Sequence, residues 1–279
     1  MIGVFDSGFG GLTVLKEFID KNSPLSQYDY IYLGDNARAP YGDKSPEVIY
    51  KYTQEAVDFL FSQGCRLIII ACNTASANAL RKIQQEFLPN KYPAKRVLGV
   101  VIPAVEAVME ELEKSANLKK ENNKIGVIGT RHTIGSKAYE KEFKKRDYKL
   151  IIYSLACPLL VPLIEEGLIK KVAARMILKS YLRKLKEKKI KILILGCTHY
   201  SVLFEPIKKI MGKNVKVINS PQAVARKLID YLARHPEIAK KISRRKKRKY
   251  YTTDNVDQFK HIGEKFLKEK IINIGKASF

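Results

Sequence analysis

The sequence predicts an α/β protein of two similar lobes, each a parallel sheet flanked by helices, with one site between them. Short β-branched runs alternate with helix-period segments along the chain, which is typical of parallel sheets. Two of these runs end in a cysteine, Cys72 and Cys197. The sequence leading to them is repeated, so the two halves are expected to be related by pseudo-twofold symmetry.

The repeat is visible in two pairs of segments. Residues 2–8 resemble residues 125–131, an offset of 123, and Cys72 and Cys197 are offset by 125. Because the spacing within each half is nearly equal, the two halves should fold alike and direct their thiols into one cleft from opposite sides. Thiols in that arrangement could remove a proton from one face of a carbon and return it to the other.

Several segments have the short, β-branched composition of buried strands. They are residues 2–5, 30–33, 66–71, 97–101, 125–128, 150–154, 190–195, 215–218 and 249–252. Helix-period segments lie between them, and the longest is 159–188. Ser45 before Pro46 and Ser220 before Pro221 are expected helix N-caps with proline at the first helical position.

The domain boundaries follow from the repeat. The segments after Met211 contain no motif like those around the cysteines, so we expect them to join the first sheet. The first lobe is therefore expected to comprise residues 1–98 and 210–279. The second lobe is expected to comprise residues 99–209, and the chain then crosses twice between the lobes.

Length and composition are those of an enzyme with substantial cores. The chain has 279 residues, of which 46% are hydrophobic, enough for about two domains. No apolar run approaches the ~20 residues of a membrane span. The chain enters its first strand at once and leaves no room for a signal peptide, so we expect a cytoplasmic protein. Cys65 and Cys157 are expected to be reduced, buried core residues, and no metal site is expected.

The charge suggests an alternative class. Lys plus Arg outnumber Asp plus Glu by 52 to 28, a formal net charge of +24, and residues 244–249 form a basic block. A non-enzymatic nucleic-acid-binding protein is the alternative that such a charge supports. The basic residues are, however, spread along helical segments, and the block lacks the interleaved aromatic residues of a single-strand binding platform. We expect the block to be a solvated face, and the positive field to attract a dianionic substrate.

Polar clusters follow two of the predicted strands, where ligands bind in open α/β sheets. In residues 6–11 the glycines permit a tight turn whose backbone N–H groups can hold an anion. Their spacing is neither a dinucleotide fingerprint nor a phosphate loop. Asp6 could alternatively be a helix cap. Residues 34–42 form a Pro- and Gly-containing loop able to present main-chain donors to a carboxylate.

With these motifs, the chain resembles the glutamate racemases, cofactor-independent enzymes that interconvert L- and D-glutamate. The matching segments are residues 3–11, 34–42, 71–76, 157–165, 195–200 and 251–267. Two cysteine motifs in this order, preceded by Asp6-Ser7, are more specific than any one of them alone. The chain departs from the family at Ser201, where proline is usual.

The resemblance implies roles for individual residues. Cys72 and Cys197 would be the two bases, with Asp6 assisting the first and His199 and Glu165 the second. Such assistance is needed because a free thiol is mostly protonated near neutral pH. Two of these residues also have plain alternatives, since His199 could be a core histidine and Glu165 could lie on a solvated helix face. The implied substrate-binding residues are Asp6, Ser7, Pro40, Tyr41, Gly42, Asn73, Thr74, Thr130, Thr133, Thr198 and His199.

The resemblance also implies a biological role and partners. The product D-glutamate would supply peptidoglycan synthesis, without a cofactor or a metal, and the partners would be glutamate and a second copy of the chain in a homodimer. A racemase of aspartate or a hydantoin is the enzymatic alternative. A single-cysteine decarboxylase is disfavoured, because both cysteines are present.

Overall fold

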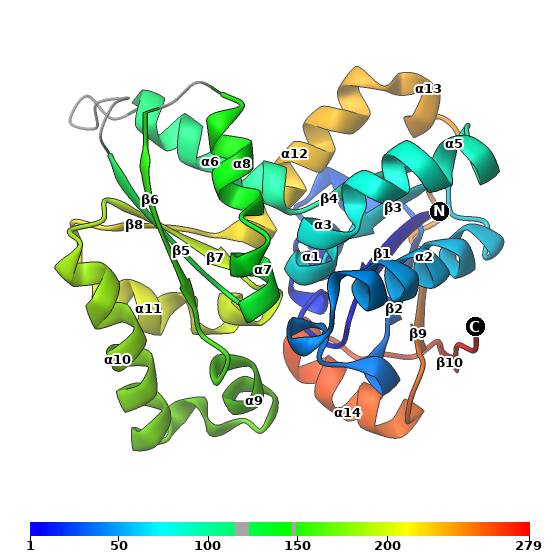
Figure 1. Ribbon diagram of the computed structural model, residues 1–279. Coiled ribbons are helices and arrows are strands. Elements are labelled where there is room, and N and C mark those ends of the chain that lie inside the picture. The colour runs from blue at the N-terminus through cyan, green and yellow to red at the C-terminus, as the bar shows by residue number, and fades with distance from the viewer. Residues whose placement is uncertain (115–122, 147–148) are drawn as a thin grey trace.

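The computed structural model describes residues 1–114, 123–146 and 149–279, and these form two parallel sheets with helices on both faces (Figure 1). The strands are β1 Ile2–Asp6, β2 Tyr30–Gly34, β3 Leu67–Ile70, β4 Arg96–Gly99, β5 Lys124–Gly129, β6 Ile151–Ala156, β7 Ile192–Gly196, β8 Lys216–Ile218, β9 Arg248–Thr252 and β10 Ile274–Lys276. The predicted class, α/β with two lobes, is confirmed.

The strand order confirms the internal repeat. The first sheet runs β10-β9-β2-β1-β3-β4 and the second β6-β5-β7-β8, with all paired strands parallel. β1 lies between β2 and β3 as β5 lies between β6 and β7, and β4 and β8 occupy matching edges. The two halves therefore share a four-strand core. β9 and β10 extend the first sheet only, and β10 was not expected from the sequence.

The expected lobe boundary differs from the observed strand pairing. A boundary at 209/210 assigns residues 215–218 to the first lobe, but β8 pairs with β7 in the second sheet. The physical reason is the repeat itself, because β8 completes the second sheet at the edge that β4 completes in the first. We therefore propose that the second lobe extends to about residue 218 and that the chain returns to the first lobe at the following helix.

The helices cover both faces of the sheets. They are α1 Leu12–Ile19, α2 Pro46–Ser62, α3 Asn73–Asn78, α4 Leu80–Lys82, α5 Leu88–Lys91, α6 Val101–Lys114, α7 Arg131–Gly135, α8 Ala138–Lys144, α9 Leu160–Glu165, α10 Val172–Glu187, α11 Phe204–Met211, α12 Ser220–Arg234, α13 Pro236–Ala239 and α14 Val256–Leu267. Shorter turns include the π-helical Ile83–Phe87 and the 3₁₀ turns Leu168–Lys170 and Thr198–Leu203. α12 packs against α1 of the first lobe and α6 of the second (Figure 1).

Two local expectations about helices are corrected. Residues 159–188 are not one helix: α9 ends before Gly167, whose φ of 67° is left-handed, and α10 begins at Val172. The cap of α12 is Asn219, whose side chain accepts a hydrogen bond from the Gln222 N–H, whereas the Ser220 hydroxyl donates to the Leu195 carbonyl at 3.0 Å. The cap at Ser45 is confirmed by its bond from the Val48 N–H.

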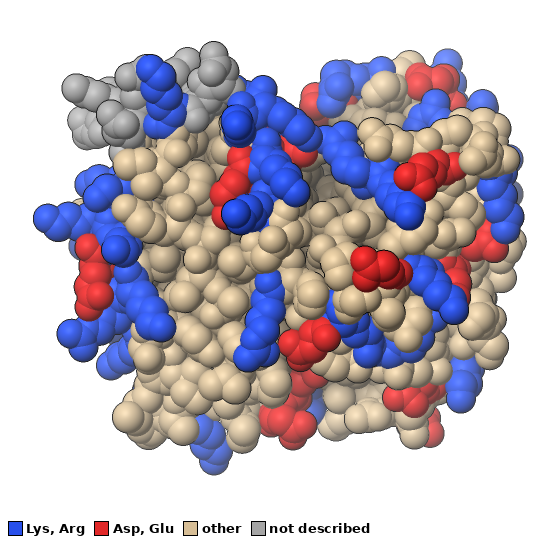
Figure 2. All heavy atoms as spheres, in the orientation of Figure 1, with Lys and Arg blue, Asp and Glu red and all other residues tan. Residues whose placement is uncertain are grey.

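Cations are distributed over both lobes. On the face shown in Figure 2, Lys and Arg side chains lie over both lobes with Asp and Glu among them. Within residues 1–114, 123–146 and 149–279, no helix combines the length and apolar character needed to cross a bilayer.

The basic block is only partly the solvated face that was expected. The Arg248 guanidinium donates to the Tyr28 and Ser26 carbonyls at 2.5 and 2.6 Å and lies 5.0 Å from the Tyr30 ring. The backbone N–H groups of Arg245 and Lys247 both donate to Asp29 Oδ1 at 2.8 Å. The block is therefore partly an anchor that brings β9 to the edge of β2.

Replacing Arg248 by glutamine is expected to lower the free energy of unfolding by about 1.5–3 kcal/mol, the usual contribution of hydrogen bonds to a charged group. The same replacement at Lys249, an exposed cation in the same strand, should change the free energy of unfolding by less than about 0.5 kcal/mol. Urea denaturation of both variants provides the measurement. Equal stability of the two variants would contradict an anchoring role for Arg248.

Candidate active site between the lobes

The predicted site residues lie where the carboxyl ends of the strands of both sheets meet. Asp6 is the last residue of β1, Cys72 precedes α3, and Cys197 directly follows β7. Parallel strands place such residues at one edge of a sheet. The lobes touch there, since Thr198 Oγ1 of the second lobe donates to Asp6 Oδ2 of the first at 3.3 Å.

The first thiol belongs to a buried group of the first lobe. Cys72 Sγ lies 3.4 Å from Ser7 Oγ and is almost fully excluded from solvent. Burial, together with the negative charge of Asp6, raises the pKa of Cys72 to about 12. In this environment the thiol holds its proton, so it becomes a base only if a neighbour accepts that proton.

Asp6, whose charge acts on Cys72, is the acidic candidate for such a neighbour. Its carboxylate is fully buried and also accepts a hydrogen bond from the Gly8 N–H at 3.0 Å. Burial raises the pKa of Asp6, although the charge of His199 and the hydrogen bonds to the carboxylate oppose this shift. Asp6 does not cap α1, because the N-cap there is Gly11 without a side-chain bond. It both closes its own turn and contacts the opposite lobe.

The second thiol has a different set of neighbours. Cys197 Sγ lies 3.9 Å from His199 Nδ1, and His199 Nε2 lies 2.8 Å from Glu165 Oε1. Glu165 is 34% exposed at its side chain and touches the thiol's partner, so it is more than a residue of a solvated face. His199 is buried, and its ring lies nearly perpendicular to that of Phe266, with the two ring centroids 5.5 Å apart. These contacts form a chain from Glu165 through His199 to Cys197.

The neighbours of His199 favour its protonated form. Burial acts to lower the pKa of His199, but its contacts with Cys197 and Glu165 outweigh this and raise the pKa to about 10. The imidazolium places a positive charge beside the Cys197 sulfur. The two half-sites are thus electrostatically unlike, with a carboxyl group at Cys72 and an imidazolium at Cys197.

The pKa of His199 predicts a pH-dependent contribution to stability. The folded protein keeps a proton that the unfolded chain releases near pH 6.5, so the contribution is complete below about pH 6.5 and is lost as the pH rises toward 10. The free energy of unfolding of the native protein minus that of His199→Asn should fall across this window, as measured by urea denaturation. A difference that is flat or grows with pH would show that His199 is neutral in the folded protein.

Small polar side chains connect the lobes beside the first thiol. Thr74 Oγ1 lies 2.9 Å from Thr130 Oγ1 and 3.3 Å from Thr133 Oγ1, and the Tyr139 hydroxyl donates to Asn73 Oδ1 at 2.7 Å. Asn73 and Thr74 begin α3 of the first lobe, whereas the other three residues belong to the second. The predicted substrate-binding residues therefore face each other across the boundary. Tyr139, one of their partners, carried no signal in the sequence.

The loop of residues 34–42 is held together by Asp35, which, like Tyr139, was not among the predicted site residues. The buried Asp35 carboxylate accepts hydrogen bonds from the Tyr41 hydroxyl and from Arg38 Nε. Pro40 follows a cis peptide bond, and a Cβ on Gly42 would lie 3.0 Å from Thr130 Cβ. The loop thus packs directly against the second lobe. The predicted Pro40, Tyr41 and Gly42 lie beside the threonine cluster.

Gly10 shows how closely the lobes approach. A Cβ at this position would lie 2.2 Å from Thr198 Oγ1 and 2.5 Å from His199 Nδ1. Only glycine leaves room for those side chains to reach Asp6 and Cys197.

The remaining cysteines and a large groove lie away from the predicted site residues. Cys65 and Cys157 are fully buried, as expected for core residues. A groove of about 1400 Å³ between α1, α6, α11 and α12 is lined by none of the predicted site residues.

The sequence over residues 2–228 matches the family described as Asp/Glu/Hydantoin racemase. The chain belongs to this family. As a member of the Asp/Glu/hydantoin racemases it is an isomerase, which confirms the enzyme class and the resemblance inferred from the cysteine motifs.

Relatives within the racemase family match nearly the whole chain. The glutamate racemase of Geobacter metallireducens is 38% identical over 278 residues, covering 99% of this chain and 96% of that protein. The crystal structure of glutamate racemase from Francisella tularensis in complex with D-glutamate is 36% identical with a TM-score of 0.85, covering 99% of this chain and 97% of that one. Glutamate racemase isoform RacE1 from Bacillus anthracis is 35% identical with a TM-score of 0.86, covering 100% and 97%.

Proposed function

We propose that this racemase interconverts L- and D-glutamate through two thiols, without a cofactor. The observation that carries the proposal is the placement of Cys72 and Cys197 on opposite lobes of one site, each beside its own ionisable helper. A racemase must break a C–H bond on one face of the α-carbon and form one on the other. Two bases on facing lobes meet that requirement.

The proposed reaction is a proton relay. In one direction, the thiolate of one cysteine takes the α-proton, so a C–H bond breaks and an S–H bond forms. The resulting carbanion takes the proton of the other thiol, which leaves that sulfur as the thiolate. The reverse direction exchanges the two roles. His199 favours the thiolate of Cys197 by its charge, and Asp6 can accept the proton that burial holds on Cys72.

The proposed choice of glutamate rests on the relatives and on the site's donors. The relatives described above are named glutamate racemases and cover nearly the whole chain. The hydroxyls of Thr74, Thr130 and Thr133, together with the backbone N–H groups of residues 41 and 42, can donate hydrogen bonds to carboxylates. We further propose that D-glutamate from this reaction supplies peptidoglycan synthesis and that the chain acts as a homodimer.

The test is racemisation of pure L-glutamate by the purified protein without added cofactor, followed by circular dichroism. We expect the signal to decay to zero, and in D₂O the α-position of the product should carry deuterium. The same assay with L-aspartate examines the alternative substrate. Turnover of aspartate alone would replace the proposal, and product free of deuterium would exclude the proton relay.

The nucleic-acid alternative has less support. The cations of the 244–249 block are partly used to anchor β9, and the cations on the viewed face lie among acidic residues (Figure 2). Measurement of affinity for single- and double-stranded oligonucleotides at ~0.15 M salt would reveal such a function directly.

A further inference from the structure

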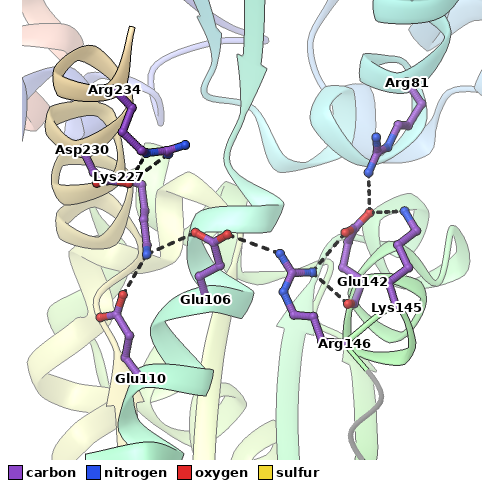
Figure 3. Close-up of polar contacts among 9 residues, drawn as sticks. All are labelled: Arg81, Glu106, Glu110, Glu142, Lys145, Arg146, Lys227, Asp230 and Arg234. Atoms are coloured by element: carbon purple, nitrogen blue, oxygen red, sulfur yellow. Dashed lines mark hydrogen bonds and ion pairs between the residues drawn. The ribbon is translucent and has the colours of Figure 1, made fainter.

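An ion pair between the lobes lies outside the proposed reacting groups. Arg81 Nη2 of α4 lies 3.0 Å from Glu142 Oε1 of α8, so the pair joins the first lobe to the second (Figure 3). Neither residue contacts either thiol or its helpers in the described contacts. Its position suggests a role in holding the lobes rather than in the chemistry.

The pair continues a line of cross-lobe contacts. Nearest the first thiol, α3 contacts the second lobe through Asn73 with Tyr139 and through Thr74 with Thr130 and Thr133. Under the proposed function, these inner groups also hold substrate, so their hydrogen bonds to one another must be exchanged when glutamate binds. The inner contacts therefore cannot hold the lobes independently of the ligand.

The Arg81–Glu142 pair does not have to be exchanged when substrate binds, and other cations hold the Glu142 side chain in place. Glu142 is mostly buried and also pairs with Lys145 at 2.7 Å and Arg146 at 3.3 Å. Burial acts to raise the pKa of Glu142, but the hydrogen bonds from Lys145 and Arg81 lower it, so the group is a carboxylate. One surface ion pair contributes little by itself, but a carboxylate held by several cations is a better-defined partner.

Further ion pairs connect Glu142 to α6 and α12. Figure 3 shows the line of contacts that continues from Glu142 through Arg146 to Glu106 of α6, and from there through Lys227 of α12 to Glu110. The Arg81–Glu142 pair is thus connected by ion pairs to α6 and α12, and α12 packs against helices of both lobes. Two steps of this line join the lobes as divided above: Arg81 of α4 with Glu142, and Lys227 of α12 with Glu106 and Glu110 of α6.

We propose that Arg81 is a positioning residue, whose pair with Glu142 holds the lobes at the separation at which both thiols can reach one α-carbon. The inference rests on the proposed racemase function. Without the pair, a smaller fraction of the protein has the binding-competent separation, and the apparent affinity for substrate falls in proportion. Both enantiomers need the same separation, so their KM values change by the same factor.

The test compares Arg81→Gln with Lys145→Gln. Both side chains are just over half exposed and both bind Glu142 Oε1, but Lys145 directly follows α8 in the same lobe as Glu142 and does not join the lobes. We expect Arg81→Gln to raise KM about three- to fivefold for L- and D-glutamate alike, with kcat and the melting temperature little changed. Lys145→Gln should leave KM unchanged, and Arg81→Lys should recover most of the loss.

Several results would overturn the role of Arg81. These are an unchanged KM in Arg81→Gln, an equal rise in Lys145→Gln, or a loss confined to one direction of the reaction. Hydrogen exchange of α3 and α8 gives a second readout, which should be faster in Arg81→Gln than in the native protein whether or not glutamate is turned over. If the native protein fails to racemise glutamate, the proposed function fails while this readout still decides whether the pair holds the lobes.

Discussion

Replacing either Cys72 or Cys197 by alanine is expected to abolish racemisation while the fold remains intact. Each thiol is the base for one enantiomer and the acid for the other, so neither direction can proceed with one sulfur. We expect kcat to fall by about 10⁴-fold in both directions, the upper range for a positioned acid or base. Each substitution removes one sulfur at the site, so the melting temperature should change little.

The chain supplies matched controls for this experiment. Cys65 and Cys157 are buried thiols whose pKa values are also raised to about 12 by burial, but they lie outside the site. Their alanine variants should keep kcat within about threefold of the native value. Substantial turnover in Cys72→Ala or Cys197→Ala would exclude the two-thiol mechanism. Loss of activity in the control variants would show that the assay reports folding rather than chemistry.

Asp6→Asn and His199→Asn are expected to impair the two directions of the reaction unequally. Asp6 is a buried carboxyl group at the Cys72 side, whereas His199 is an imidazolium beside Cys197. Groups of opposite charge cannot assist their thiols in the same way, so each variant should slow one proton transfer more than the other. We expect a loss of about 10²-fold in kcat in the more affected direction.

Isotope effects on α-deuterated L- and D-glutamate would show this bias at the chemical step. The overall equilibrium is fixed by the mirror symmetry of the enantiomers, so any directional change in kcat must be matched in KM. Glu165→Gln is an informative companion, because Glu165 reaches the thiol only through His199 and should produce the same bias as His199→Asn. Equal effects in both directions for both variants would mean that Asp6 and His199 act in substrate binding instead.

The local pattern predicted the parts of the fold that depend on local composition. Each predicted strand is present, because a short β-branched run between turn residues has few other stable states. β10 is the exception, with three residues and a glycine at its centre, Gly275, which give no strand signal. The helix over 159–188 was divided by a left-handed Gly167, which periodicity does not reveal.

Partners in space were harder to predict than elements. The matching cysteine motifs indicated a shared site. The sequence could not show that the Tyr41 hydroxyl donates a hydrogen bond to Asp35 or that the Tyr139 hydroxyl donates one to Asn73. These bonds join residues whose relation depends on how loops close and how the lobes meet. The same holds for Arg81 and Glu142, which read in the sequence as ordinary charged helix residues.

The sequence by itself determined the alternation of strands and helices, the internal repeat, and the position of each thiol at the end of a strand, because these are properties of contiguous residues. Only the tertiary structure decided that β8 joins the second sheet, that Glu165 meets His199, and that Gly10 leaves room for the opposite lobe. Strand pairing and contacts between lobes depend on which surfaces fit together. A hydrophobic pattern with a period of two or 3.6 residues shows which face of an element is buried, but not which other element packs against that face.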